Sequence, residues 1–212
     1  IDVARDPRWG RIAESPGEDP YLSARYAEAF VRGFQGDDMS DPQSVMSCLK
    51  HFAAYGAAEG GRDYDGVDLS PARLHDVYMP PFVAGVRAGA GSVMAAFNTV
   101  NGTPMHAHAE LINQVLRKTY GFSGLVVSDY TGILELINHR VARTESDAAL
   151  LGVTAGVDAD MVSEFYLKTL EVSVKEGLLE ESVIDSACRR VLEAKRDLGL
   201  FDNPYRRMQT SP

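Results

Sequence analysis

Cysteine is scarce in this sequence, with only Cys48 and Cys188 among 212 residues. Two cysteines do not make a disulfide framework, and they do not supply a structural zinc site. We therefore expect both side chains to behave as small buried hydrophobic groups.

Long apolar runs are also missing, because charged residues interrupt each of them well before membrane-spanning length. We expect no transmembrane helix and no membrane partner. No signal peptide is present, yet the chain opens at Ile1 inside an apolar segment, which is not a plausible natural start. The missing signal therefore leaves the compartment open.

Basic residues are outnumbered, with 21 Lys and Arg against 30 Asp and Glu and a formal net charge of -9. A nucleic-acid-binding protein needs a basic face that displaces counterions from phosphates, and no Lys/Arg cluster here provides one. The composition, 45% hydrophobic and 24% charged, is ordinary for a globular domain with one sizeable core. The partner is therefore expected to be a neutral or small molecule.

Short apolar runs alternate with longer amphipathic stretches, which is typical of βα units and a parallel sheet. The expected strands cover residues 1–4, 45–49, 92–97, 124–127 and 156–159. The expected helices cover 21–34, 71–88, 109–120, 146–154, 164–176 and 181–198. Ser70 before Pro71 predicts a helix start, and Gly177 predicts a helix end.

Polar residues follow nearly every apolar run. In parallel α/β folds the carboxyl ends of the strands meet on one face, where catalytic groups gather. The alternative is that loops are simply polar, but a charge directly after each strand favours a site. The residues concerned are Arg5, Asp6, Lys50, His51, Asn98, Ser128, Asp129, Asp158 and Asp160.

The most specific segment is 120–129, YGFSGLVVSD, in which a turn leads into a buried strand that ends at Asp129. Alone, an aspartate at a strand end caps the next helix or binds Mg²⁺ as readily as it attacks a substrate. The chain also contains three other ordered motifs: RDPRWGR at 5–11, KHF at 50–52 and VMAAFN at 93–98. Together these four motifs resemble glycoside hydrolase family three, the β-glucosidase and β-xylosidase family, and segment 53–70 is most similar to its bacterial periplasmic β-glucosidase branch.

The resemblance covers essentially the whole chain and implies a retaining, exo-acting β-glycosidase that requires no cofactor or metal. It identifies Asp129 as the nucleophile that forms a glycosyl-enzyme intermediate. It assigns Arg11, Lys50 and His51 to binding of the terminal sugar, and we expect Met94 to line the same pocket. The alternative for Arg11 is an ion pair with Glu14 or Glu18, and for His51 a hydrogen-bonded core position.

Neighbouring strand residues normally point to opposite faces. For Lys50 and His51 both to reach a sugar, the strand end must be distorted, so we expect local strain at 50–52.

Three positions depart from the family pattern. Tyr130 stands where many members have tryptophan, which keeps an aromatic platform at the rim but reduces its area. Phe97 replaces a tyrosine whose hydroxyl contacts the nucleophile, so other groups must orient Asp129. The branch that cleaves N-acetylglucosaminides carries a catalytic histidine where this chain has Tyr55 and Gly56, so that activity is not expected.

The resemblance implies a (β/α)8 barrel, which typically needs about 250 residues and exceeds this chain. We therefore expect an α/β fold with about the last five βα units at 1–203, and a linker or tail at 204–212. The general acid/base is expected beyond Pro212, because loop 57–65 offers only Glu59, Asp63 and Asp65 and none matches a family position. Open sheet edges predict a homo-oligomer, or dependence on missing barrel and sandwich segments.

Two other functions remain open at this stage. Lys50 after an apolar strand also suits a Schiff-base lyase, in which burial lowers the pKa of the amine. Without an acid/base residue, the chain also fits a non-catalytic carbohydrate-binding fragment. For the glycosidase we expect a β-linked oligosaccharide or an aryl glycoside as substrate, and a periplasmic or extracellular location.

Overall fold

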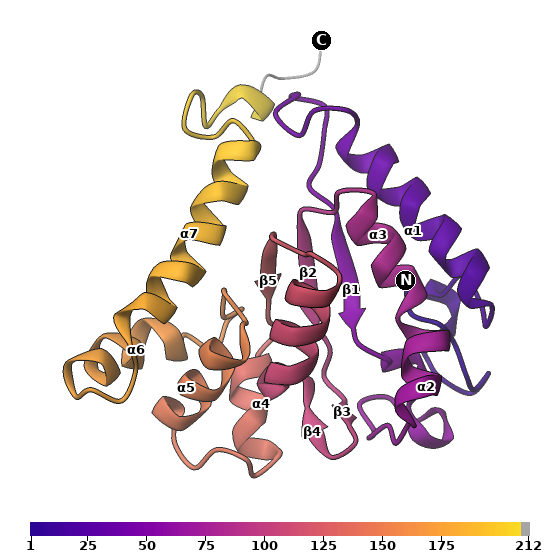
Figure 1. Cartoon of the computed structure of the whole chain (residues 1–212), viewed down its shortest axis with the longest axis horizontal. Coiled ribbons are helices and arrows are strands. Elements are labelled where there is room, and N and C mark those ends of the chain that lie inside the picture. Colours follow the sequence, from indigo (N-terminus) through magenta and orange to yellow (C-terminus); the bar gives the residue numbers. More distant parts are fainter. Residues whose placement is uncertain (209–212) are drawn as a thin grey trace.

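A parallel sheet of three strands forms the centre of the computed structural model, which describes residues 1–208 (Figure 1). Strands β1 (Cys48–Phe52), β2 (Ser92–Ala95) and β5 (Leu125–Val127) lie in that order, and both neighbouring pairs are parallel. An isolated parallel bridge then joins Val127 to Ala159. The predicted α/β class and the predicted order of neighbouring strands are confirmed.

Residues 1–4 form no strand, so the prediction for this segment is wrong. The extended backbone instead bonds to loops on either side: Ala4 N donates to Gly17 O at 2.9 Å, and Arg5 N donates to Gly56 O at 3.0 Å. Residues 156–159 likewise form no strand, and they join the sheet through the bridge at Ala159 and a hydrogen bond from Asp158 N to Val126 O at 2.7 Å. Residues 99–104 turn back on themselves as the antiparallel hairpin of β3 (Thr99–Val100) and β4 (Thr103–Pro104).

Helices lie on both sides of the sheet in Figure 1, with α1 packed on α3 on one side and α5, α6 and α7 on the other. The α-helices are α1 (Pro20–Gln35), α2 (Pro71–Arg73), α3 (Pro80–Arg87), α4 (Gly132–Asn138), α5 (Glu145–Ala155), α6 (Phe165–Lys175) and α7 (Glu181–Asp197). Two segments are π-helical, η4 (Leu74–Tyr78) and η6 (Glu110–Thr119), and the short 3-10 helices are Ile12–Glu14, Tyr55–Ala57, Glu59–Gly61, Met105–Ala107 and Arg206–Met208.

Local capping chemistry explains where the helices begin and end. The Asp19 carboxylate accepts the backbone N–H groups of Tyr21 and Leu22 at the start of α1. Thr144 and Asp147 form a reciprocal capping box at the start of α5, which satisfies two N–H groups that a helix leaves unpaired. The predicted start at Ser70 and end at Gly177 are confirmed, since Ser70 Oγ accepts Arg73 N and Gly177 adopts a positive φ of 71°.

One helical prediction needs correction, and one helix was not expected from the sequence. The expected helix 71–88 is divided into α2, η4 and α3, because Pro80 and Pro81 cannot donate hydrogen bonds to the preceding turn. Helix α4 was not predicted at all. Its seven residues are too few to show a full amphipathic period, and it begins directly after the strand-end motif.

The core lies between the sheet and the helices. Phe52 of β1 packs edge to face on Phe82 of α3, with ring centroids 5.1 Å apart. The two cysteines are outside this core: both are free, as expected, but both are exposed, so the prediction of burial is wrong. Cys48 begins a strand at the sheet edge, and Cys188 lies on α7 beside an open groove. Among residues 1–208, no helix is long and apolar enough to cross a membrane.

The end of the described chain returns to the loop that follows α1. Arg207 donates to Leu198 O at 2.6 Å and to Ser44 O at 3.4 Å. The remaining part of the predicted tail, 209–212, lies outside the described residues.

Candidate active site

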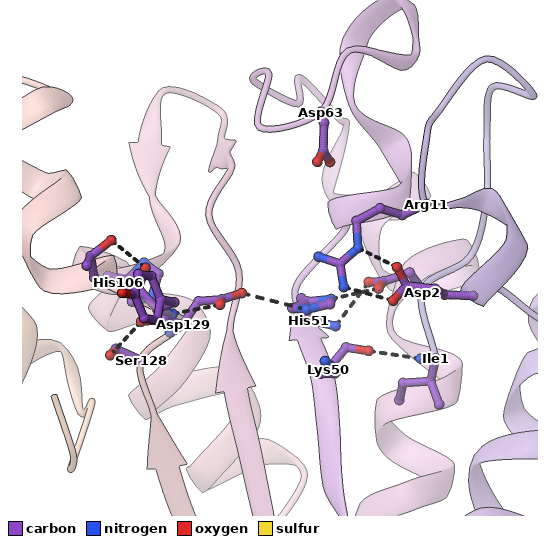
Figure 2. Close-up of polar contacts among 12 residues, drawn as sticks. Ile1, Asp2, Arg11, Lys50, His51, Asp63, His106, Ser128 and Asp129 are labelled. Carbon is purple, nitrogen blue, oxygen red and sulfur yellow. Dashed lines mark hydrogen bonds and ion pairs between the residues drawn. The ribbon is translucent and has the colours of Figure 1, made fainter. Parts of the chain in front are cut away.

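Asp129 lies two residues after the end of β5, where the sheet delivers its side chain to the carboxyl edge (Figure 2). The residue is 9% exposed, and its Oδ1 accepts the backbone N–H of Tyr130 at 2.7 Å. The other carboxylate oxygen, Oδ2, has no hydrogen-bond partner among the described residues and lies 3.6 Å from Nε2 of His51. One oxygen is therefore held by the protein, while the other is buried and available.

The backbone around Asp129 is held from two further elements. Its N–H donates to Nε2 of His106 at 3.0 Å, and its carbonyl accepts the hydroxyl of Ser128 at 2.9 Å. Ser128 Oγ also accepts Met161 N at 2.8 Å, which ties the next loop to the same point. Phe97 has no hydroxyl and cannot donate a hydrogen bond to the Asp129 carboxylate.

His51 lies at the carboxyl end of β1 and is 2% exposed. Its Nδ1 lies 2.9 Å from Oδ2 of Asp2, and its backbone N–H donates to Oδ1 of the same carboxylate at 3.1 Å. Its ring thus spans two carboxylates, Asp2 on one side and Asp129 on the other, as Figure 2 shows.

The end of β1 is irregular, as expected. Its pairing with β2 shifts register between Leu49 and Phe52, so the regular alternation of faces stops at Lys50 and His51. The peptide bonds Lys50–His51 and Phe52–Ala53 are cis. Lys50 is exposed and its carbonyl accepts the N-terminal amine of Ile1, whereas His51 is buried and faces Asp129 (Figure 2).

Arg11 faces the same region but is engaged by Glu14. Its Nε and Nη2 atoms lie 2.9 and 2.8 Å from the two Glu14 oxygens, so the ion pair considered from the sequence is present. The Arg11 guanidinium also lies over the ring of Tyr55, 5.4 Å from its centroid, and that ring contacts His51 at a centroid distance of 5.0 Å. Burial raises the pKa of the Tyr55 hydroxyl, which therefore stays protonated.

Met94 and Tyr130 complete the predicted set. Met94 is half-buried in β2 and pairs in register with Val127, two residues before Asp129. Tyr130 is 60% exposed and lines a cavity of about 330 Å³ next to the site. The other residues that line this cavity are Tyr64, Phe97, Thr131, Glu135 and His139.

The family of the chain follows from its match to known sequences, because residues 1–194 match the model described as the glycosyl hydrolase family 3 N terminal domain. The chain belongs to this family. It is 48% identical over 205 residues to a periplasmic beta-glucosidase of Salmonella typhimurium, with 97% of this chain and 27% of that protein covered. It is also 40% identical over 208 residues to a putative beta-xylosidase of Formosa agariphila, with 96% and 28% covered.

Solved structures agree with the family 3 assignment. The beta-glucosidase of Listeria innocua in complex with isofagomine superimposes with a TM-score of 0.96 at 43% identity, covering 100% of this chain and 30% of that chain. A beta-glucosidase from Erythrobacter marinus gives 0.92 at 40% identity, with 96% and 28% covered. The chain therefore spans under a third of the length of these relatives, and its fold corresponds to part of their N-terminal domain.

Two residues of the site were missed in the sequence. Asp2 was placed inside a strand and given no role, although it accepts two hydrogen bonds from His51. His106 was given no role in the site, whereas it accepts the backbone N–H of Asp129. Neither role leaves a local signal, since each partner is at least 23 residues away in the chain.

Other predicted strand-end carboxylates do not belong to the site. Asp158 forms ion pairs with Arg117 at 2.7 Å and Arg190 at 2.8 Å, and Asp160 accepts Phe165 N at the start of α6. All three contacts hold parts of the fold together. Among residues 1–208, no group of three or more His, Cys, Asp or Glu side chains is arranged to hold a metal ion.

The loop carboxylates considered as acids are also engaged. Glu59 pairs with Arg5 at 3.0 Å, and Asp63 accepts the indole N–H of Trp9 at 2.9 Å.

His106 predicts how stability depends on pH. Burial lowers the pKa of His106 to about 3, so the folded protein keeps this ring neutral while the unfolded chain binds a proton below about pH 6.5. The unfolded state therefore binds more protons between these values, and stability falls as the pH falls. We expect His106 to contribute a slope of up to about 1.4 kcal/mol per pH unit between pH 6 and 4.

Urea unfolding of the wild-type protein and of His106→Gln at several pH values measures this slope. The variant should lose stability less steeply below pH 6, because its amide does not titrate. Equal slopes for the two proteins would show that His106 is not held neutral by the fold. Gly132 makes room for this buried ring, because a Cβ atom there would lie 2.2 Å from His106 Nε2.

Proposed function

We propose that the whole protein containing this chain is a retaining, exo-acting β-glycosidase of the β-glucosidase type. It releases the terminal non-reducing sugar through a glycosyl intermediate on Asp129. The observation that carries this proposal is the unpartnered Oδ2 of a buried carboxylate, beside His51 at 3.6 Å. Attack on an anomeric carbon requires such a free carboxylate oxygen on a rigid support.

The reaction has two steps. Asp129 Oδ2 forms a bond to the anomeric carbon while the glycosidic C–O bond breaks and the leaving oxygen takes a proton from a general acid. Water then attacks the same carbon from the opposite face, gives a proton to the conjugate base of that acid, and releases Asp129. The acid/base residue is expected in sequence beyond residue 212, within the longer family 3 protein.

Arg11, Lys50, His51 and Met94 are proposed to bind the terminal sugar. The Arg11–Glu14 pair does not exclude Arg11 from this role, because the Glu14 side chain is 58% exposed. Exposed ion pairs contribute at most about 1 kcal/mol, so hydroxyl groups of a sugar can replace the Glu14 contact at little cost.

The leaving group is proposed to lie over Tyr130. Its exposed ring borders the 330 Å³ cavity, in which Tyr64 and Phe97 pack edge to face with centroids 4.9 Å apart. Aromatic walls of this kind accommodate either a second sugar of a β-linked oligosaccharide or an aryl aglycone. Because the relative from Salmonella is named a periplasmic beta-glucosidase, we also propose a periplasmic or extracellular location.

Association is proposed to complete the fold. The isolated sheet ends at β1 on one side and at the Ala159 bridge on the other. Further barrel and sandwich segments, or a second copy of the chain, are expected to cover these edges.

A slow substrate with fluorine at C2 and a dinitrophenyl leaving group tests the proposed function. The good leaving group makes the first step possible, and fluorine slows the second, so the sugar stays on its nucleophile. We expect mass spectrometry to find the fluoroglucosyl group on the peptide that contains Asp129. Borohydride reduction in the presence of substrate should leave Lys50 unmodified, whereas labelling of Lys50 would support the Schiff-base lyase. A protein that binds sugars without labelling or turnover would be the non-catalytic alternative.

A further inference from the structure

We propose that Asp2 is a positioning residue of the active site, which acts by orienting the imidazole ring of His51 toward Asp129. This inference rests on the proposed function, since it assumes that Asp129 is the nucleophile. It adds a residue outside the strand-end motifs, on a segment that precedes the RDPRWGR motif.

The contacts of the Asp2 carboxylate are directed at one residue. Oδ1 accepts the backbone N–H of His51 at 3.1 Å, and Oδ2 lies 2.9 Å from its Nδ1. Among the described residues, every hydrogen bond of this carboxylate goes to His51. The side chains of Asp2 and His51 are 9% and 3% exposed, so water does not compete for either contact.

The two contacts with Asp2 together restrict both the position and the rotation of the His51 ring. The backbone contact anchors the carboxylate at the irregular end of β1, and the ring contact then sets the rotation of the imidazole about its Cβ–Cγ bond. With Nδ1 bound to Asp2, Nε2 must point away from it, and this atom faces Asp129 Oδ2 at 3.6 Å. Without Asp2 the ring has no polar partner on its Nδ1 side and loses this orientation.

In many proteins a carboxylate that is hydrogen-bonded to one nitrogen of an imidazole determines which ring nitrogen is protonated and where the other nitrogen points. Here this arrangement joins residues 2, 51 and 129, which lie on three separate parts of the chain. The titratable groups that contact the ring are Asp2, Tyr55 and Asp129, and the Arg11 guanidinium lies over the Tyr55 ring.

Asp2→Asn is the informative variant, made in the natural full-length polypeptide. Asparagine has the same shape, and its Oδ1 can still accept the backbone N–H of His51. Its amide group, however, donates where the carboxylate accepts, so it turns the ring or reverses which nitrogen carries the proton. We expect kcat/KM for a dinitrophenyl β-glucoside to fall by about 10²-fold, the loss typical of a small misplacement in an active site.

A double-mutant cycle with His51→Gln separates positioning from stability. If Asp2 acts through His51, then Asp2→Asn should have little further effect once the imidazole is absent, so the two losses do not multiply. Asp19→Asn is the matched control: it also removes one carboxylate, but asparagine is an equally good helix cap, so kcat/KM should stay unchanged. Circular dichroism and thermal melts confirm that each variant is folded at the assay temperature.

Unchanged kcat/KM in folded Asp2→Asn would overturn the proposal, and so would losses that multiply fully in the double variant. Failure of the proposed function would look different, because the fluoro sugar would then not label Asp129 in the wild-type protein. If Asp129 is labelled but the losses in kcat/KM multiply in the double variant, the glycosidase function is supported and the role of Asp2 is rejected.

Discussion

Replacing Asp129 with alanine should lower turnover of a dinitrophenyl β-glucoside by about 10⁴-fold or more, because the variant has no group that can form the covalent intermediate. The dinitrophenyl substrate is chosen because its leaving group does not depend on general-acid assistance, which is typically worth about 10² to 10⁴ in rate. Cellobiose does depend on it, so fragments without the acid/base residue should cleave cellobiose little or not at all. Initial rates on both substrates measure this difference.

Adding azide to the Asp129→Ala variant is a second test of the nucleophile. A small anion fits the space that the Asp129 carboxylate leaves, and it attacks the anomeric carbon from the same face. The product should therefore be a glycosyl azide of the α configuration, formed only by Asp129→Ala. Wild-type rates in this variant, or a β-configured azide, would be incompatible with Asp129 as the nucleophile.

Replacing Asp158 with asparagine should lower the free energy of unfolding by about 3 kcal/mol, because two arginines lose their common counter-charge. The Asp158 side chain is 1% exposed, and it contacts Arg117 at 2.7 Å and Arg190 of α7 at 2.8 Å. Its Oδ2 also accepts Val126 N at 2.8 Å, so the same carboxylate fastens β5. Urea unfolding of the wild-type and variant proteins measures the difference.

Asp197→Asn is the matched control for this stability effect. Asp197 pairs with Arg196 at 2.9 Å, but the two side chains are 40% and 65% exposed. Exposed pairs are worth at most about 1 kcal/mol, so this variant should change stability far less. Similar losses for both variants would mean that burial of the Asp158 cluster has little energetic importance.

Local patterns predicted the elements that depend on neighbours in the chain. The alternation of apolar runs and amphipathic stretches predicted a parallel sheet with β1, β2 and β5 in order, and this order is present. The start at Ser70 and the end at Gly177 follow from local hydrogen bonding and were also predicted. Residues 1–4 show where prediction from local patterns fails, because a short apolar run becomes a strand only if another strand pairs with it.

The candidate site was likewise predicted only where it depends on a local motif. The motif that ends at Asp129 identified the residue that stands two positions after β5, and the distortion expected at Lys50 and His51 is seen as a register shift. The sequence did not reveal the contacts between His51 and Asp2 or between Asp129 and His106, which span 49 and 23 residues. Such pairs form only when the sheet brings its strand ends together.

The sequence by itself determined the family, the parallel α/β arrangement and the identity of the candidate nucleophile, because each follows from residue order within a short motif or from local periodicity. Tertiary structure alone decided which polar residues serve the site and which serve the fold. Asp129 and Asp158 both follow apolar runs, yet one keeps an unpartnered oxygen beside His51, while the other is neutralised by two arginines. The physical reason is that the role of a carboxylate depends on the charges packed around it, and packing brings those charges from distant parts of the chain.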